Sequence, residues 1–194
     1  MAVRKIRIWP DPALTEVAKP VEQFDDSLRE LVDDMFETMY QANGVGLAAT
    51  QIAEPRRVLV IDLSPSTAPA EETGTAEELA RWGFTGPTAF INPEIVESEG
   101  HIIWEEGCLS VPGITDKVKR KERVKVRARD VHGEPFEVDA KGLFAVALQH
   151  EGDHLNGRTF VEYLSKLKRD VIRRKMMRLK DETDNDGVAA AAAI

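Results

Sequence analysis

The chain has 194 residues, of which 42% are hydrophobic and 31% charged, with a formal net charge of −8 and one cysteine. This size and composition predict one globular domain with a core of its own, and the negative charge argues against a protein that coats nucleic acid over its whole surface. One cysteine excludes an internal disulfide, no run reaches the about 18 apolar residues of a membrane span, and the N-terminus lacks the apolar stretch of a secretory signal, so we expect a protein of the reducing cytoplasm.

The first predicted element is an amphipathic helix within residues 25–44, because apolar side chains recur there at helical spacing. Ser27 and Glu30 form a candidate capping box, with Asp25 and Asp26 competing for the cap. Short apolar runs then predict strands at 56–63, 88–98 and 101–107, and the alternation around His132-Gly133 predicts a hairpin over 123–140. A second helical pattern covers residues 143–157.

Two segments differ from this pattern in composition. Residues 64–88 are rich in Ser, Thr, Pro, Gly and Ala, and predict a surface insertion with one or two helical turns over 75–82. The insertion could border a substrate cleft or extend the far edge of the fold. The tail, 181–194, has no apolar periodicity and is expected to be disordered, which leaves residues 1–180 as the single domain.

A third helix is predicted over 165–180, where eight Lys and Arg accompany the single Asp170. The local net charge of +7 leaves −15 on the rest of the chain. An apolar face opposes the basic one, so the helix is expected to pack on the core. The face consists of Leu164, Leu167, Val171, Ile172, Met176 and Leu179.

The second helical pattern contains the H-E-x-x-H motif, with His150 and His154 four residues apart and Glu151 beside the first. On one helix face the two imidazoles can bind one metal ion, and the glutamate can act as a general base. Because the motif recurs by chance, two polar positions on a surface helix are the alternative. The apolar run directly upstream, LFAVAL, indicates that the histidines begin inside the protein.

A catalytic metal site of this kind needs a third protein ligand. The metzincin continuation fails because Phe160 stands where the third histidine belongs. For a thermolysin-like site, Glu162 lies too near and Glu182 lies in the tail.

The remaining candidate is Cys108, between Gly107 and the Pro112-Gly113 turn, since a thiolate binds Zn²⁺ or Fe²⁺ well. A buried structural cysteine is the alternative. His101 and His132 are expected to be ordinary surface residues.

Three segments of the chain together resemble the motifs of the peptide deformylases. They are GVGLAATQ (44–51), EGCLS (106–110) and HEGDHLNG (150–157), and they occur in the family's order. One motif alone would be suggestive, whereas the ordered set is highly specific. The resemblance extends from about Ile6 to Lys180, apart from the insertion. We therefore expect an α+β fold in which antiparallel or mixed β-sheets pack around a central H-E-x-x-H helix, with an N-terminal and a C-terminal helix.

The resemblance implies a hydrolase that removes the N-formyl group from the initiator methionine of new polypeptides, giving formate and a free amine. Cys108, His150 and His154 match the family's metal ligands, with a water molecule completing a tetrahedral site. The implied cofactor is one divalent ion, Fe²⁺ in the cell, with Zn²⁺ and Ni²⁺ also compatible. Glu151 would take the proton of the water and pass it to the departing amine.

Two further positions match the family's donors to the reaction's oxyanion. These are the side-chain amide of Gln51 and the backbone N–H of Leu109. Gly44 and Gly46 would permit close approach of a substrate backbone, and a positive φ where needed, so that the peptide binds as an added strand. The candidates for a methionine pocket are Val45, Leu143, Val146 and Ala147, with plain core packing as the alternative for each.

The basic helix also has a counterpart in the resemblance, because bacterial deformylases carry a C-terminal helix that docks on the ribosome near the exit tunnel. We expect helix 165–180 to contact rRNA phosphate rather than a membrane surface, and we expect no DNA partner. Two other functions stay open. A zincin-like metallopeptidase would need another third ligand, and a non-catalytic ribosome-associated protein would be expected to have lost Gln51, Cys108 or Glu151, which are all present.

Overall fold

The structure is a computed structural model that describes residues 2–64 and 74–186, with side chains through Lys180. Its helices and short 3-10 turns are η1 (Pro12–Thr15), α1 (Asp26–Gln41), η2 (Ala49–Ile52), α3 (Ala76–Arg81), α4 (Gly142–Leu155), η3 (Phe160–Tyr163) and α5 (Lys166–Asp186). Its strands are β1 (Gly46–Ala48), β2 (Val58–Ile61), β3 (Thr88–Glu99), β4 (Ile102–Glu106), β5 (Asp116–Arg120), β6 (Arg123–Arg129) and β7 (Pro135–Lys141).

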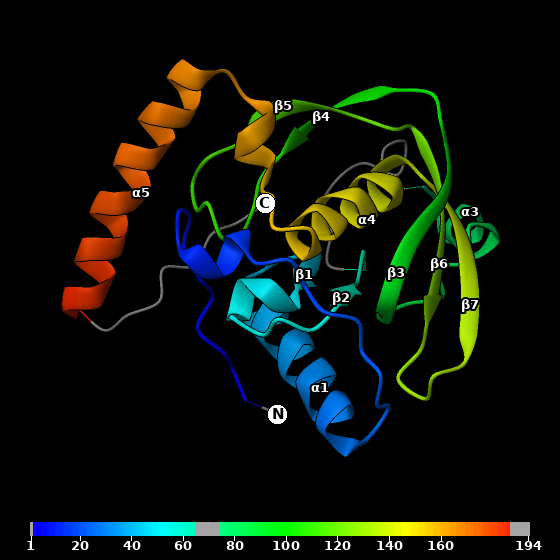
Figure 1. The fold of residues 1–194 in the computed structure, drawn as a ribbon. Helices are drawn as coiled ribbons and strands as arrows, with labels where there is room; N and C mark the ends of the chain where they lie inside the picture. Colours follow the sequence, from blue (N-terminus) through cyan, green and yellow to red (C-terminus); the bar gives the residue numbers. More distant parts are fainter. Residues whose placement is uncertain (1, 65–73, 187–194) are drawn as a thin grey trace.

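Two antiparallel sheets are arranged around α4. Five strands form the larger sheet in the order β1-β2-β3-β6-β7, and β4 pairs with β5 in the smaller one. In Figure 1 helix α4 lies at the centre of the fold, α1 lies below β1 and β2, and α5 stands at the outside. The predicted α+β fold with a central helix is therefore confirmed.

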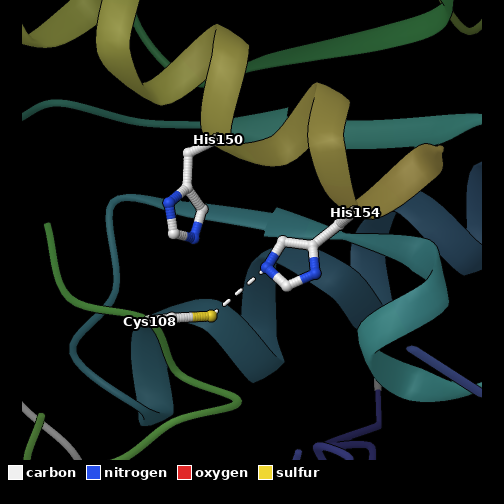
Figure 2. Close-up of side chains that lie close together, drawn as sticks. All are labelled: Cys108, His150 and His154. Atoms are coloured by element: carbon white, nitrogen blue, oxygen red, sulfur yellow. Dashed lines mark hydrogen bonds between the residues drawn. The ribbon is translucent and has the colours of Figure 1, made fainter. Parts of the chain in front are cut away.

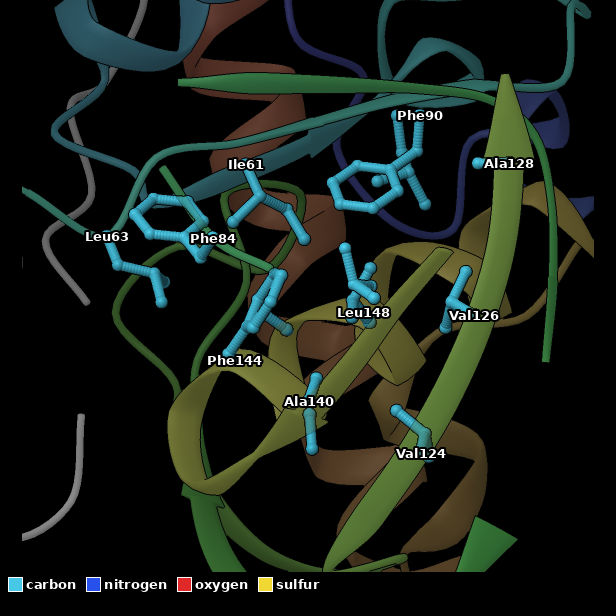
Figure 3. Close-up of a cluster of buried hydrophobic side chains, with 14 of the residues drawn as sticks. Ile61, Leu63, Phe84, Phe90, Val124, Val126, Ala128, Ala140, Phe144 and Leu148 are labelled. Carbon is cyan, nitrogen blue, oxygen red and sulfur yellow. The ribbon is translucent and has the colours of Figure 1, made fainter. Parts of the chain in front are cut away.

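Strand β2 separates two cores. Leu59 and Ile61 pack in the cluster that contains α4, whereas Val58 and Val60 pack in the cluster that contains α1. Because successive side chains of a strand point to opposite faces, a strand buried on both faces needs a continuous apolar run. Figure 3 shows the cluster on the α4 side, where Phe90 and Phe144 meet with ring centroids 6.3 Å apart.

The described part of the insertion, residues 74–88, extends the β7 edge of the larger sheet. The carbonyl of Trp82 accepts a hydrogen bond of 3.1 Å from the Asp139 N–H, and Phe84 packs edge-on against Phe144 with centroids 5.2 Å apart. The helical turns predicted over 75–82 are confirmed as α3, which begins with a capping box of Thr75 and Glu78. The described part of the insertion thus contacts both β7 and α4.

Two predicted helix ends are corrected. The cap of α1 is Asp25, whose carboxylate accepts from the Leu28 N–H, while Ser27 donates its hydroxyl to Asp25 instead of forming the expected capping box. Helix α5 continues to Asp186, into the segment expected to be disordered. Residues 166–186 contain no proline or glycine, so nothing in the sequence ends the helix at Lys180. Residues 187–194 of the predicted tail lie outside the described residues.

Helix α5 packs on a third core through fewer residues than predicted. Ile172 and Met176 are buried in a cluster with Trp9 and Cys108. Leu167 and Val171, expected on the packed face, are 74% and 52% exposed. One of the basic side chains contacts this core as well: the guanidinium carbon of Arg173 lies 5.0 Å from the centroid of the Trp9 ring. Among the described residues, no helix combines the length and the apolar character needed to cross a lipid bilayer.

Candidate metal centre and active site

Helix α4 carries both histidines into the interior. Every residue of α4 from Leu143 to Glu151 is buried, which agrees with a helix enclosed on all sides over this stretch. His150 is 8% exposed, Glu151 5% and His154 is fully buried. The prediction that the two histidines begin inside the protein is therefore confirmed.

Cys108 meets the two histidines from the loop that follows β4. Its Sγ lies 3.2 Å from Nε2 of His154, and the donor atoms of Cys108, His150 and His154 all lie within 4.8 Å of one another. Figure 2 shows the thiol and the two rings directed toward a common centre. Among the described residues this is the one group of His, Cys, Asp or Glu that could hold a metal ion.

The positions considered for another third ligand lie elsewhere. Phe160, at the metzincin position, stacks on the His150 ring with centroids 6.2 Å apart, so it forms a wall of the centre. Glu162 is exposed on η3, and the side chain of Glu182 lies outside the described residues. His101 and His132 are exposed, as expected of surface residues.

Glu106 orients the first histidine, a relationship that the sequence did not reveal. Its Oε2 lies 2.8 Å from Nδ1 of His150, so the carboxylate accepts the Nδ1 proton and Nε2 is the ring nitrogen left for another partner. Glu106 is 3% exposed and is held in turn by the guanidinium of Arg120, at 2.5 and 2.9 Å. Glu106 belongs to the EGCLS segment, but nothing in that segment assigns it a role.

The electrostatics of the centre suit a cation. Burial lowers the pKa of His150, but its hydrogen bonds to Cys108 and Glu106 and the negative charges of Cys108 and Glu151 outweigh burial and raise that pKa well above the usual value. The surroundings therefore stabilise a positive charge at the ring, which a proton or a metal ion can supply. Burial and the charges of His150 and Arg120 hold the pKa of His154 well below its usual value, so His154 is a neutral imidazole. A thiol with two imidazoles is the donor set that Zn²⁺ and Fe²⁺ prefer. The residues therefore fit one divalent metal ion.

Glu151 lies beside the centre with one carboxylate oxygen, Oε2, that has no hydrogen-bond partner among the described residues. Burial raises the pKa of Glu151 to about 7, against the charge of His150 and with the help of the charge of Glu106. A buried oxygen without a partner is costly unless another group binds it. A buried carboxyl group whose pKa lies near neutrality, next in sequence to a candidate metal ligand, is a candidate acid–base group.

Gln51 and Leu109 both adjoin Cys108. The Gln51 amide nitrogen lies 3.2 Å from Oγ of Ser110 and 3.7 Å from Sγ of Cys108, and its oxygen accepts from the Ala48 N–H at 2.7 Å. Gln51 is 1% exposed, so this orientation is fixed by its neighbours. Leu109 is also buried, directly after the cysteine.

The two glycines of the first motif are close to this chain's own side chains. A Cβ on Gly44 would lie 2.7 Å from Cδ1 of Leu109, and a Cβ on Gly46 would lie 2.6 Å from Oε1 of Glu151. Neither glycine has a positive φ, so the conformational reason that we considered for them does not hold. A glycine is needed at both positions because another side chain packs against its backbone: Leu109 against Gly44, and Glu151 against Gly46.

The candidate pocket residues are buried, except for Val45, which is half-buried. Leu143 and Ala147 belong to the cluster of Figure 3, and Val45 is half-buried against that cluster. Val146 is 3% exposed, one helical turn before His150. The geometry therefore agrees with core packing for Leu143 and Ala147, and it leaves a role in binding as a proposal for all four.

Comparison with known proteins supports the same conclusion as the geometry. Residues 3–170 match the family model described as polypeptide deformylase. The chain is 52% identical over 176 residues to the peptide deformylase of Chromobacterium violaceum, covering 91% of this chain and 95% of that protein. The crystal structure of a peptide deformylase from Legionella pneumophila has a TM-score of 0.81 at 47% identity, covering 94% of this chain and 98% of that one. The peptide deformylase of Ehrlichia chaffeensis in complex with actinonin has a TM-score of 0.81 at 42% identity, covering 92% and 98%.

An α+β fold whose central helix brings two histidines to a cysteine defines a metal-dependent hydrolase. The chain belongs to the polypeptide deformylase family. The family resemblance of the three sequence motifs is thereby confirmed, and with it the enzyme class.

Proposed function

We propose that Cys108, His150 and His154 hold one divalent metal ion, Fe²⁺ in the cell, with Zn²⁺ or Ni²⁺ able to replace it. The observation that carries the proposal is the convergence of their three donor atoms within 4.8 Å. When bound, the ion supplies Lewis-acid chemistry, because it lowers the pKa of a coordinated water molecule and polarises a carbonyl oxygen. The remaining steps fall to side chains and backbone groups of this chain.

The substrate that we propose is a nascent peptide that begins with N-formylmethionine. Its main chain would pair with the edge of β1 that β2 leaves free, along Val45 and Gly46, since β1 has a partner strand on one side only in the described sheet. The methionine side chain would enter an apolar slot. We assign that slot to Val45, Leu143, Val146 and Ala147.

Glu151 carries the proton in the proposed reaction. It accepts a proton from the attacking water and delivers it to the amide nitrogen when the bond between the formyl carbon and nitrogen breaks, so that formate and a free amine leave. The proposal is supported by its buried carboxylate, which lies beside Gly46 of β1, the strand along which we propose that the substrate binds. Oε2, which lacks a partner among the described residues, is the atom available to the proton.

The oxyanion that forms on the formyl carbon needs donors that are in place beforehand. We assign this role to the Gln51 side-chain amide and the Leu109 backbone N–H. Ser110 and Ala48 fix the Gln51 amide, so it requires little reorganisation during the reaction.

Release of formate from a formyl-Met peptide tests this proposal, with the acetyl-Met peptide of the same sequence as a control. We expect turnover of the formyl peptide by the metal-loaded protein and loss of turnover after chelation. Equal turnover of the two peptides would contradict a formyl-specific site, and activity that survives complete metal removal would contradict the metal's role.

A second proposal concerns α5, which we infer docks on rRNA phosphate of the ribosome. Several of its cations are engaged within the chain: Lys168 pairs with Asp116 at 2.6 Å, and Lys175 donates to the Gly113 carbonyl at 3.2 Å. Lys166 and Arg178 are exposed and have no side-chain partner among the described residues. These two are therefore the positions where phosphate contact would be added without breaking an internal bond.

A further inference from the structure

The proposed metal site is assembled from two parts of the chain that are far apart in sequence. Cys108 follows the strand β4, whereas His150 and His154 both belong to α4. Three donor atoms can bind one ion only if the strand and the helix keep a fixed separation. A group that joins the two elements would therefore control the geometry of the site.

The guanidinium of Arg120 is such a group. Nε and Nη2 donate to the two carboxylate oxygens of Glu106, at 2.5 and 2.9 Å, and Nη1 donates to Oδ2 of Asp153 at 2.5 Å. Glu106 is the last residue of β4, and Asp153 lies on α4 between the two histidines. One planar cation thus bonds to the strand that leads to Cys108 and to the helix that carries His150 and His154.

Tyr163, on η3, completes the surroundings of this cation. Its ring lies under the guanidinium at 4.7 Å from the centroid, and its hydroxyl donates to the same Oδ2 of Asp153 at 2.9 Å. The side chain of Arg120 is 4% exposed and that of Asp153 is 16% exposed, so solvent weakens the ion pair between them little. Buried charges of this kind are stable only when their partners are complete.

We propose that Arg120, fixed by Asp153 and Tyr163, is a positioning residue that holds the strand of Cys108 and the helix of His150 and His154 at the separation the metal requires. The inference rests on the proposed function, which makes these three residues the ligands. Arginine is needed because its planar fork bonds both oxygens of Glu106 and still reaches Asp153. A lysine has one nitrogen and cannot make all three contacts in this geometry.

The chain offers a matched pair of tyrosines for the test. Tyr163→Phe removes the hydroxyl bond to Asp153 but keeps the ring under Arg120. Tyr40→Phe removes the equivalent bond of 2.7 Å to Asp62, and Tyr40 has a similar exposure, 38% against 48% for Tyr163. Tyr40 has no contact with the Arg120 network, so it serves as the control for the loss of a tyrosine–carboxylate bond.

The experiment measures Zn²⁺ affinity, by competition with a chelator, for the zinc-loaded full-length protein and for Arg120→Lys, Tyr163→Phe and Tyr40→Phe. We expect Arg120→Lys to weaken binding by about 10- to 100-fold, and Tyr163→Phe to weaken it by about 2- to 10-fold. Tyr40→Phe should bind as the wild type does. The thiolate charge-transfer band of the Co²⁺-loaded protein should change in Arg120→Lys and stay unchanged in Tyr40→Phe.

Wild-type affinity in both Arg120→Lys and Tyr163→Phe would overturn the inference, as would an equal loss in the two tyrosine variants. If Arg120→Lys does not fold, the comparison of the tyrosine variants decides. Cys108→Ser distinguishes this result from a failure of the proposed function. If Cys108→Ser binds Zn²⁺ as the wild type does, the ligand assignment itself is wrong; if Cys108→Ser loses Zn²⁺ and the Arg120 network variants do not, only the positioning role is wrong.

Discussion

The carboxylate of Glu151 occupies the space in which a larger residue at position 46 would place its first side-chain atom. A Cβ built on Gly46 would lie 2.6 Å from Oε1 of Glu151 and 3.0 Å from its Cγ. Strand β1 and helix α4 therefore approach each other at this point through a glycine. The contact links β1, along which we propose that the substrate binds, directly to the proposed acid–base group.

Gly46→Ala is expected to lower kcat/KM for the formyl-Met peptide by about 100-fold, because a catalytic group displaced by about 1 Å loses activity on this scale. The chain should still fold, since the clashing atom is the end of a flexible side chain. Formate release and thermal unfolding, measured on the same preparation, check both statements. Wild-type kcat/KM in Gly46→Ala would show that Glu151 does not depend on the glycine.

Glu151→Gln is expected to keep the metal ion and to lower kcat by about 100- to 10,000-fold, since the amide keeps the shape of the carboxylate but cannot accept the proton. Metal content and turnover measured together separate this effect from a loss of the ion. If the variant lost its metal, Glu151 would be acting on the centre rather than on the reaction.

Gly152→Ala is expected to stabilise the protein by about 1 kcal/mol, the usual difference between glycine and alanine inside a helix. Gly152 lies within α4 without a positive φ, and a Cβ there would meet no atom within 4 Å. It borders a hollow of about 270 Å³ on the side of α4 that carries Asp153. Chemical denaturation of the metal-free protein measures the effect, and a loss of stability would mean that the hollow is filled by a group that the alanine displaces.

Ribosome binding should depend on Lys166 and Arg178, the exposed cations of α5 for which the described part of the chain offers no side-chain partner. The double variant Lys166→Glu with Arg178→Glu is expected to weaken binding and to make its logarithm less steeply dependent on the logarithm of salt concentration, by about 2 units of slope. Lys19→Glu makes the same change of charge per residue at an exposed lysine outside α5 and serves as the control. If the double variant bound the ribosome as tightly as the Lys19→Glu control, α5 would not be part of the interface.

Regular elements and motif residues were predictable from the sequence because their signals are local. The periodicity of α1 and α4 and the continuous apolar run of β2 each follow from residues within one element. The three-residue β1 was too short to give a pattern, and the charged, exposed positions of β5 concealed its alternation. The cap of α1 was misassigned because Ser27 and Asp25 are both good capping residues, and only the geometry selects Asp25.

The surroundings of the site were less predictable than its centre. Cys108 could be inferred because two histidines on one helix lack a third ligand and the chain has a single cysteine. Glu106 and Arg120 could not, since a glutamate and an arginine on adjacent strands are ordinarily a solvated pair. Their burial, and the bond of Arg120 to Asp153, arise only when the sheet of β4 and β5 folds onto α4.

The central claim is that Cys108 completes the metal site that His150 and His154 begin. It is tested most directly by anaerobic metal analysis of the wild type and of Cys108→Ser, with formate release measured on the same samples. The account predicts one metal ion per wild-type chain, and loss of most of that metal and of the activity in the variant, because a serine hydroxyl is a poor ligand for Fe²⁺ or Zn²⁺. A Cys108→Ser protein that kept both its metal and its activity would contradict the account.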